Sequence, residues 1–278
     1  MKNLIVRAIT GVFFVAAIVV SFLNPVAMAL LFALVTGLTI WEFTGLVNDH
    51  VGQTTVNRPI CTVSGVWFFL SVYAYSCGIA PSAVFLAYLF SIVYLFISEL
   101  YLKHENRISD WAYTMLSQMY IAIPFSLINV LAFQSSSADG AIHYNYILPL
   151  SIFIFLWTSD TGAYCSGSLF GKHKLFPRVS PGKSWEGSIG GAILVLIVAY
   201  IISTFSHQLT PLQWMGLGLV VVVFGTWGDL VESLFKRTLG IKDSGNILPG
   251  HGGMLDRFDS SLMAFPAAAI YLYIVSLA

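Results

Sequence analysis

Charge is what this 278-residue sequence has least of. Only 9% of its residues are charged, 13 basic and 13 acidic, and the formal net charge is zero, while 57% of the residues are hydrophobic. An ordinary soluble domain has about 25% charged residues. The composition therefore excludes an ordinary soluble domain, and the zero net charge gives no overall field that would attract nucleic acid.

Cysteine is also scarce. The three residues, Cys61, Cys77 and Cys165, are scattered, without a CxxC pair or a Cys/His ligand spacing. This pattern argues against a disulfide framework, and free cysteines of this kind usually serve as small apolar packing residues.

Long apolar runs fill most of the chain. A membrane-spanning helix needs roughly 20 predominantly apolar residues, and nine runs approach that length. They predict an all-α, polytopic membrane protein with about nine transmembrane helices. The runs are 4–23, 26–46, 59–78, 81–102, 112–133, 145–167, 187–206, 212–235 and 260–277.

The first run has some features of a cleaved signal peptide. Lys2 and Arg7 lie at its start, and the small-residue sequence Ala27-Met28-Ala29 follows it. The apolar sequence resumes at once, however, which favours a first transmembrane helix over a cleaved leader.

The basic residues lie before the first run or in alternate gaps between the runs, if Arg7 near the start of the first run is counted as extending outward from its helix. The positive-inside rule then places the N-terminus and every basic gap in the cytoplasm, and the C-terminus outside. Because one helix more or fewer would disturb this alternation, it supports the count of nine. The basic residues are Lys2, Arg7, Arg58, Lys103, Arg107, Lys172, Lys174, Arg178, Lys183, Lys236, Arg237, Lys242 and Arg257.

The charged residues are concentrated in the second half of the chain, where 157–260 hold 15 of all 26. We therefore expect residues 1–140 to form a transmembrane scaffold. Residues 141–278 are expected to form the catalytic region, with its site at the cytoplasmic face.

The segment 225–237 carries a polar helical face. Asp229, Glu232, Ser233 and Lys236 follow the spacing i, i+3, i+4 and i+7, which places them on one side of a helix. A carboxylate in a span usually faces the protein interior or a water-filled cavity. The alternative is a simple ion pair of these carboxylates with Lys236.

The segment 238–260 combines three kinds of residue. Its glycines allow close approach to a ligand, its cations suit phosphate oxygens, and its carboxylates are the oxygen ligands that Mg²⁺ takes. Asp259 could instead cap the last helix, and for His251 a role other than metal binding is favoured. The residues are Lys242, Asp243, Gly245, Gly250, His251, Gly252, Gly253, Asp256, Arg257 and Asp259.

The gap at 168–186 has a similar character. Asp160 lies inside or at the end of the preceding span, and the sequence SPGKSWEG offers Ser180, Lys183, Ser184 and Glu186 just before an apolar helix. Backbone N–H groups at a helix start, together with a lysine, form an anion site. The glycine spacing of a Walker A motif is absent.

Carboxylates, a metal and cations at one membrane face suit phosphoryl or nucleotidyl transfer to a lipid, in which the protein mainly positions groups and neutralises charge. No Ser/His/Asp or Cys/His arrangement indicates a covalent intermediate. The residue types alone define this class and no particular substrate.

The segment SLFKRTLGIKDSGNILPGHGGMLDRFD, 233–259, closely resembles the signature of the phosphatidate cytidylyltransferases, the CDP-diacylglycerol synthases. The segments SPGKSWEG and DTGAY also look like recurrent segments of that family. The matching positions of the signature are Ser233, Lys236, Arg237, Lys242, Asp243, Pro249, His251, Gly252, Gly253, Asp256, Arg257 and Asp259.

This resemblance implies a reaction in which CTP and phosphatidate give CDP-diacylglycerol and pyrophosphate. It implies Mg²⁺ bound by Asp229 and Asp256, with a monovalent cation such as K⁺ sharing the site, and a homodimer in a bacterial inner membrane. Lys236 and Arg237 are expected to be catalytic beside the two metal ligands, and the other site residues to bind substrate.

Other functions are less compatible with the pattern. A CTP-dependent lipid kinase acting on a polyprenol would use similar charges but release CDP. A secondary transporter should have corresponding interrupted helices in two halves, whereas the polar residues here cluster in one. A membrane scaffold has no need of aspartates beside glycines, and the helix motif of the alcohol phosphotransferases that consume CDP-lipids is missing.

Overall fold

The computed structural model describes residues 2–135, 140–245, 247 and 252–277. Within these residues, eight helices are long and apolar enough to cross a membrane, and a shorter apolar helix, Ile9–Phe22, precedes them. Strands are few and short. The prediction of an all-α polytopic membrane protein is confirmed.

The chain forms two compact units. The first comprises Met1–Tyr146 and Leu239–Arg257, and the second comprises Ile147–Thr238 and Phe258–Ala278. Each unit thus combines segments that are distant in the sequence. The functional division between a scaffold at 1–140 and a catalytic region at 141–278 stays a prediction.

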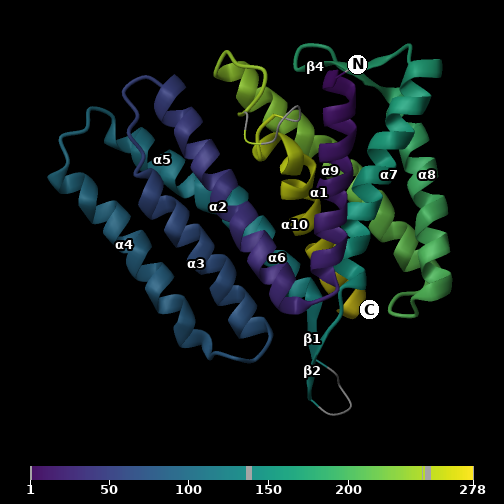
Figure 1. The fold of residues 1–278 in the computed structure, drawn as a ribbon, viewed down its shortest axis with the longest axis horizontal. Coiled ribbons are helices and arrows are strands. Elements are labelled where there is room, and N and C mark those ends of the chain that lie inside the picture. Colours follow the sequence, from purple (N-terminus) through teal and green to yellow (C-terminus); the bar gives the residue numbers. More distant parts are fainter. Residues whose placement is uncertain (1, 136–139, 246, 248–251, 278) are drawn as a thin grey trace. The chain divides into compact units, whose positions relative to one another are not determined.

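Helices α2, α3 and α4 of the first unit lie side by side (Figure 1). Asn24 caps α2, because its side chain accepts hydrogen bonds from Val26 N and Ala27 N. The elements of this unit are α1 Lys2–Phe22, α2 Pro25–His50, α3 Arg58–Ser76, η1 Ser82–Phe85, α4 Leu86–Tyr101, α5 Arg107–Ser117, η2 Gln118–Ala122, α6 Ile123–Ala132, β1 Phe133–Ser135 and β2 Ile142–Tyr144. Strands β1 and β2 pair antiparallel.

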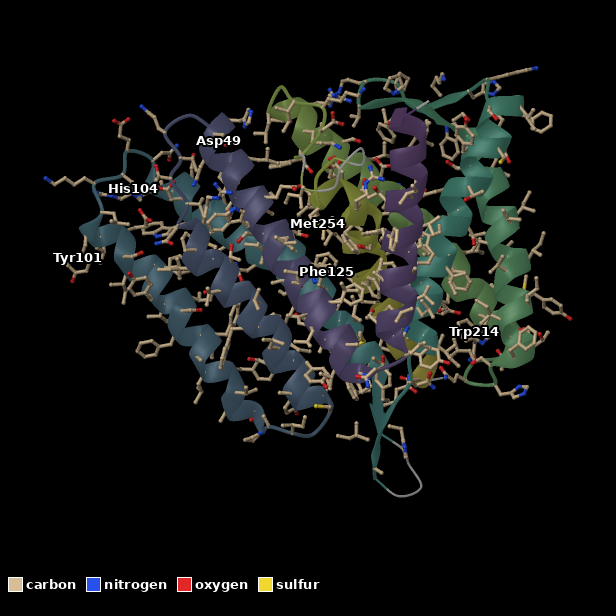
Figure 2. All side chains as sticks on the ribbon, in the orientation of Figure 1. Asp49, Tyr101, His104, Phe125, Trp214 and Met254 are labelled. Atoms are coloured by element: carbon tan, nitrogen blue, oxygen red, sulfur yellow. The ribbon has the colours of Figure 1, made fainter. Side chains whose placement is uncertain are left out.

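In the second unit, α7 packs along α8, and α8 packs along α9 (Figure 1). Its core includes Trp214, labelled in Figure 2, and an aromatic cluster in which Phe153 packs edge-on against Phe258 and Phe265. The elements are α7 Ile147–Phe170, β3 Lys174–Phe176, β4 Ser180–Ser184, α8 Trp185–Phe205, α9 Pro211–Thr238 and α10 Leu255–Leu277, whose first three residues belong to the first unit.

Each of the nine apolar runs overlaps a helical segment, but two segments differ from the expectation. The fifth contains a π-helical turn, η2, shortly before Pro124, in keeping with the lack of a backbone N–H on proline. The ninth helix begins at Leu255, not at 260. Asp259 therefore lies inside α10, and its interpretation as a helix cap is wrong.

The alternation of basic gaps has a counterpart within each unit. In the first unit, Asp49 near the end of α2 and His104 after α4 lie at the same end (Figure 2). In the second, the β3–β4 hairpin and the end of α9 lie at the same end (Figure 1). Which end faces the cytoplasm stays a prediction.

Candidate active site

A polar cavity of about 200 Å³ lies in the second unit, lined by residues of α7, β4, α8, α9 and α10. Asp160 comes from α7, Lys183 from β4, Thr226 from α9 and Ser260 from α10. Because its polar lining comes from so many elements, the cavity assembles segments that are more than 100 residues apart in the sequence.

Lys183 connects the hairpin to α9. Its ammonium lies 2.6 Å from Asp229 Oδ2 and donates a longer hydrogen bond of 3.4 Å to the carbonyl of Thr226. Ser233, one turn after Asp229, donates a hydrogen bond of 3.2 Å to Asp229 Oδ1. Both oxygens of the Asp229 carboxylate are therefore held, and its side chain is 31% exposed.

Asp259 completes a cluster of charges in this unit. It is half-buried in α10 and interacts electrostatically with Asp229, Asp160 and Lys183. The close approach of α9 and α10 requires Gly228, because a Cβ at that position would lie 2.6 Å from the carbonyl oxygen of Asp259. We call Asp160, Lys183, Asp229 and Asp259 the second-unit cluster.

The ion-pair alternative for the polar face of α9 holds for one carboxylate only. Glu232 is fully buried and its Oε2 lies 2.7 Å from the Lys236 ammonium, one turn later. Asp229 pairs with Lys183 instead. The i, i+4 spacing explains the first pair, whereas the second depends on tertiary structure.

The SPGKS segment forms strand β4, not a loop. Ser184 lines the cavity and caps α8, since its hydroxyl accepts a hydrogen bond of 3.2 Å from Gly187 N. Glu186 does not line the cavity; it accepts hydrogen bonds from the backbone N–H groups of Lys172 and His173 and pairs with the His173 ring at 2.6 Å. Ser180 also lies outside the cavity lining.

The segment 244–256 of the first unit holds a second predicted carboxylate. Asp256, in the first turn of α10, accepts hydrogen bonds on Oδ2 from Ser244 N at 2.9 Å and Gly253 N at 3.0 Å. Gly252 has a φ of +84°, and a Cβ there would lie 2.6 Å from Asp256 Oδ2. The glycines thus let the backbone wrap a carboxylate of the protein itself.

Sequence reasoning missed Glu42, which lies in α2 among residues assigned to the scaffold. It is 7% exposed and accepts hydrogen bonds from Ser244 Oγ, Met254 N and Leu255 N. A glutamate within the apolar sequence TIWEFTGL was a signal that could have been followed, because a carboxylate in a span is costly unless it has partners.

The remaining predicted site residues are mostly exposed. Arg237, Lys242, Asp243 and Arg257 are exposed, and Lys236 and Ser233 are half-buried. His251 and Pro249 lie outside the described residues.

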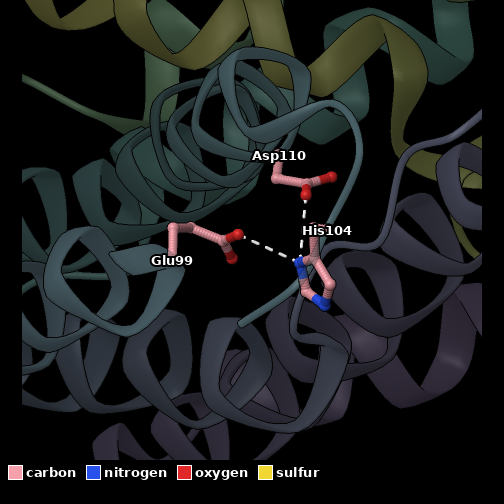
Figure 3. Close-up of side chains that lie close together, drawn as sticks. All are labelled: Glu99, His104 and Asp110. Carbon is pink, nitrogen blue, oxygen red and sulfur yellow. Dashed lines mark hydrogen bonds and ion pairs between the residues drawn. The ribbon is translucent and has the colours of Figure 1, made fainter. Parts of the chain in front are cut away.

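A further cluster in the first unit joins α4 to α5 (Figure 3). The His104 ring nitrogen Nδ1 lies 3.0 Å from Glu99 Oε2 and 3.1 Å from Asp110 Oδ2. Asp110 Oδ1 accepts a hydrogen bond from Thr55 N at 2.6 Å. Glu99 and Asp110 are buried, and we call these three residues the His104 cluster.

Asp229 and Asp256 lie in different units, and each fits a magnesium ligand by its own surroundings. Mg²⁺ is usually bound through one or two carboxylates together with substrate phosphates. Asp229 lies close to the cavity residue Lys183, and backbone N–H groups orient Asp256. A dedicated cage of many protein ligands is not required for such a site.

Taken within each unit, these features define an integral membrane protein with a polar, carboxylate-containing site among apolar helices. The model of the cytidylyltransferase family matches residues 3–275. The chain belongs to this family.

Individual relatives agree with this assignment. The chain is similar to a protein of Haemophilus influenzae named phosphatidate cytidylyltransferase. The alignment of 286 positions has 33% identity and covers 97% of this chain and 98% of the relative. Proteins of the same name from Staphylococcus haemolyticus and Staphylococcus aureus are 45% and 43% identical, over 60% of this chain and 62% of each relative.

Proposed function

We propose that this protein is a phosphatidate cytidylyltransferase, which converts CTP and phosphatidate to CDP-diacylglycerol and pyrophosphate. The family match along the chain supports this reaction. The structural observation that supports it best is the pairing of Lys183 with Asp229 at the cavity. It joins two charged residues that lie 46 positions apart in the sequence.

The reaction is a direct in-line transfer. A phosphate oxygen of phosphatidate forms a bond to the α-phosphorus of CTP, and the bond from that phosphorus to pyrophosphate breaks. Lys183, Lys236 and Arg237 bind and orient phosphate oxygens, and Lys242 and Arg257 of the first unit are further candidates for phosphate binding. Ser184 and Asp160 line the cavity.

Asp229 and Asp256 would hold Mg²⁺, with a monovalent cation such as K⁺ as a second candidate ion. When bound, the metal would neutralise charge on the phosphates. The chain's own contribution is the orientation of the two carboxylates, through Lys183 and Ser233 in one unit and through Ser244 and Gly253 in the other.

The site faces the cytoplasm in this proposal, because all basic gaps lie on the side that the positive-inside rule assigns to it. Phosphatidate keeps its acyl chains in the bilayer while its phosphate enters from the inner leaflet, and CTP arrives from water. A homodimer in a bacterial inner membrane also belongs to the proposal, and nucleic acid is not an expected partner.

The test uses purified protein with phosphatidate, Mg²⁺ and CTP labelled separately at the α- and γ-phosphates. We expect the α-label in the lipid product and the γ-label in pyrophosphate. Asp256→Asn should abolish both, since loss of a metal-bound carboxylate removes several kcal/mol of transition-state stabilisation. Asp49→Asn, the same change at an exposed position near the end of α2, is the matched control.

Two results would contradict the proposal. A γ-label in a lipid alcohol would identify a kinase, and absence of transfer by folded wild-type protein would favour transport. A cytidylyl-enzyme species trapped by rapid quench would rule out the direct route while leaving the overall reaction unchanged.

A further inference from the structure

Glu42 is a buried carboxylate in α2, a helix that the sequence led us to expect in the transmembrane scaffold. It lies in α2 between Trp41 and Phe43 and is 7% exposed. A carboxylate buried without partners is strongly unfavourable. The three hydrogen bonds that Glu42 accepts all come from residues more than 200 positions later in the chain.

Both carboxylate oxygens of Glu42 accept hydrogen bonds. Oε1 accepts from Ser244 Oγ and from Leu255 N at 3.0 Å, and Oε2 accepts from Met254 N at 2.9 Å. Helix α10 begins at Leu255, so Glu42 supplies acceptors for N–H groups that a helix start leaves without intrahelical partners. A negative charge is also favourable at this end of a helix.

Ser244 connects this carboxylate to Asp256. Its hydroxyl donates to Glu42, while its backbone N–H donates to Asp256 Oδ2. The same hydroxyl accepts a hydrogen bond of 3.3 Å from Asp256 N. Displacing Ser244 or the start of α10 would therefore move the Asp256 carboxylate.

Two glycines allow the backbone to surround Glu42. A Cβ at Gly245 would lie 2.7 Å from Glu42 Oε2, and a Cβ at Gly253 would clash with Glu42 Oε1 and Ser244 Oγ. Gly245 and Gly253 are thus fitted against a carboxylate at this position, and these glycines, expected from the sequence to approach a ligand, serve this contact.

We propose that Glu42 is a positioning residue for Asp256, the metal ligand of the proposed cytidylyl transfer, and the inference rests on that proposed function. Glu42 does not itself touch substrate. It fixes the start of α10 and Ser244, which together orient the Asp256 carboxylate. A residue that orients a metal ligand typically changes metal affinity 10–100-fold when it is replaced.

Glu42→Gln tests the proposal with little change in side-chain volume. The amide group presents an N–H donor where the carboxylate presents an acceptor, so one of the N–H groups of Met254 or Leu255 then faces another donor. Glu99→Gln is the matched control, because Glu99 is 4% exposed in α4 of the same unit and its carboxylate pairs with His104.

The first readout is the Mg²⁺ concentration that gives half-maximal formation of CDP-diacylglycerol. We expect it to rise about tenfold or more in Glu42→Gln, with much of the rate restored at saturating Mg²⁺. Glu99→Gln should retain the wild-type Mg²⁺ dependence. The proposal would be overturned in favour of a purely structural role if Glu42→Gln lost rate while its Mg²⁺ dependence stayed as in wild type. In that case saturating Mg²⁺ would not restore the rate.

The second readout needs no activity. Hydrogen exchange of the metal-free proteins should be about fivefold faster or more at either Met254 or Leu255 in Glu42→Gln, whichever amide N–H loses its acceptor, as expected for a lost hydrogen bond of about 1 kcal/mol. It should be unchanged there in Glu99→Gln. Wild-type exchange at both amides in Glu42→Gln would also overturn the proposal.

The two readouts separate this inference from the proposed function. If folded wild-type protein makes no CDP-diacylglycerol, the proposed function fails. The exchange data alone then decide whether Glu42 holds Met254 and Leu255 at the start of α10. If Glu42→Gln does not fold, Glu42→Asp replaces it, because the shorter side chain keeps the charge but cannot reach all three donors. We expect the same direction of change with a smaller shift in Mg²⁺ dependence.

Discussion

The second-unit cluster and the His104 cluster both place carboxylates and a basic group close together, but they differ in their surroundings. Asp160 and Lys183 line a cavity, and Asp229 is 31% exposed. In the His104 cluster, by contrast, Asp110 is 1% and Glu99 4% exposed. We therefore predict that the second-unit cluster, which has space for a substrate beside it, takes part in the reaction and that the enclosed His104 cluster does not.

Replacing Lys183 should have the largest effect on catalysis among the following predictions. Lys183→Met removes the ammonium beside Asp229, and we expect kcat/KM for CDP-diacylglycerol formation to fall about 100-fold, as for loss of one group that stabilises transition-state charge. Steady-state kinetics at saturating Mg²⁺ measure this. Lys172→Met, an exposed lysine before the same hairpin, is the control. Equal rates for the two variants would remove the second-unit cluster from the mechanism.

Gly252→Ala should have an intermediate effect. The left-handed φ of +84° costs a residue with a Cβ about 1–2 kcal/mol, and the new methyl group would press on the Asp256 carboxylate. We expect about a tenfold loss of rate, measured in the same assay. Gly52→Ala, where a Cβ meets nothing within 4 Å, is the control. A wild-type rate for Gly252→Ala would contradict the described loop geometry.

Glu186→Gln should have a small effect on catalysis. This result would place Glu186 outside the substrate-binding site. Glu186 holds Lys172 and His173 and does not line the cavity. We expect kcat/KM to change by about twofold or less, as for substitutions away from critical contacts. A loss as large as that of Lys183→Met would return Glu186 to the substrate-binding residues expected from the sequence.

His104→Gln should have the smallest effect on catalysis. The substitution removes the imidazole shared by two buried carboxylates, so we expect a loss of stability of about 1–3 kcal/mol, followed by thermal unfolding in detergent. The rate per folded molecule should equal that of wild type. A changed rate at unchanged stability would give the His104 cluster a role in the reaction. It would contradict the difference predicted between the two clusters.

The sequence determined the elements of this protein well. Hydrophobic run length predicted the positions of the spans because a helix satisfies its backbone hydrogen bonds locally and only apolar side chains suit lipid. The i, i+4 pair of Glu232 and Lys236 also followed from helical periodicity. The signature segment identified the family, because it combines many polar positions that apolar composition alone would not produce.

Only the tertiary structure decided which partners these residues have. Lys183 rather than Lys236 pairs with Asp229, and Glu42 rather than a ligand fills the space left by Gly253. The early start of α10 likewise depends on acceptors that Glu42 supplies from another helix. Local patterns specify what a segment can form, whereas the pairing of buried charges depends on contacts between residues far apart in the chain.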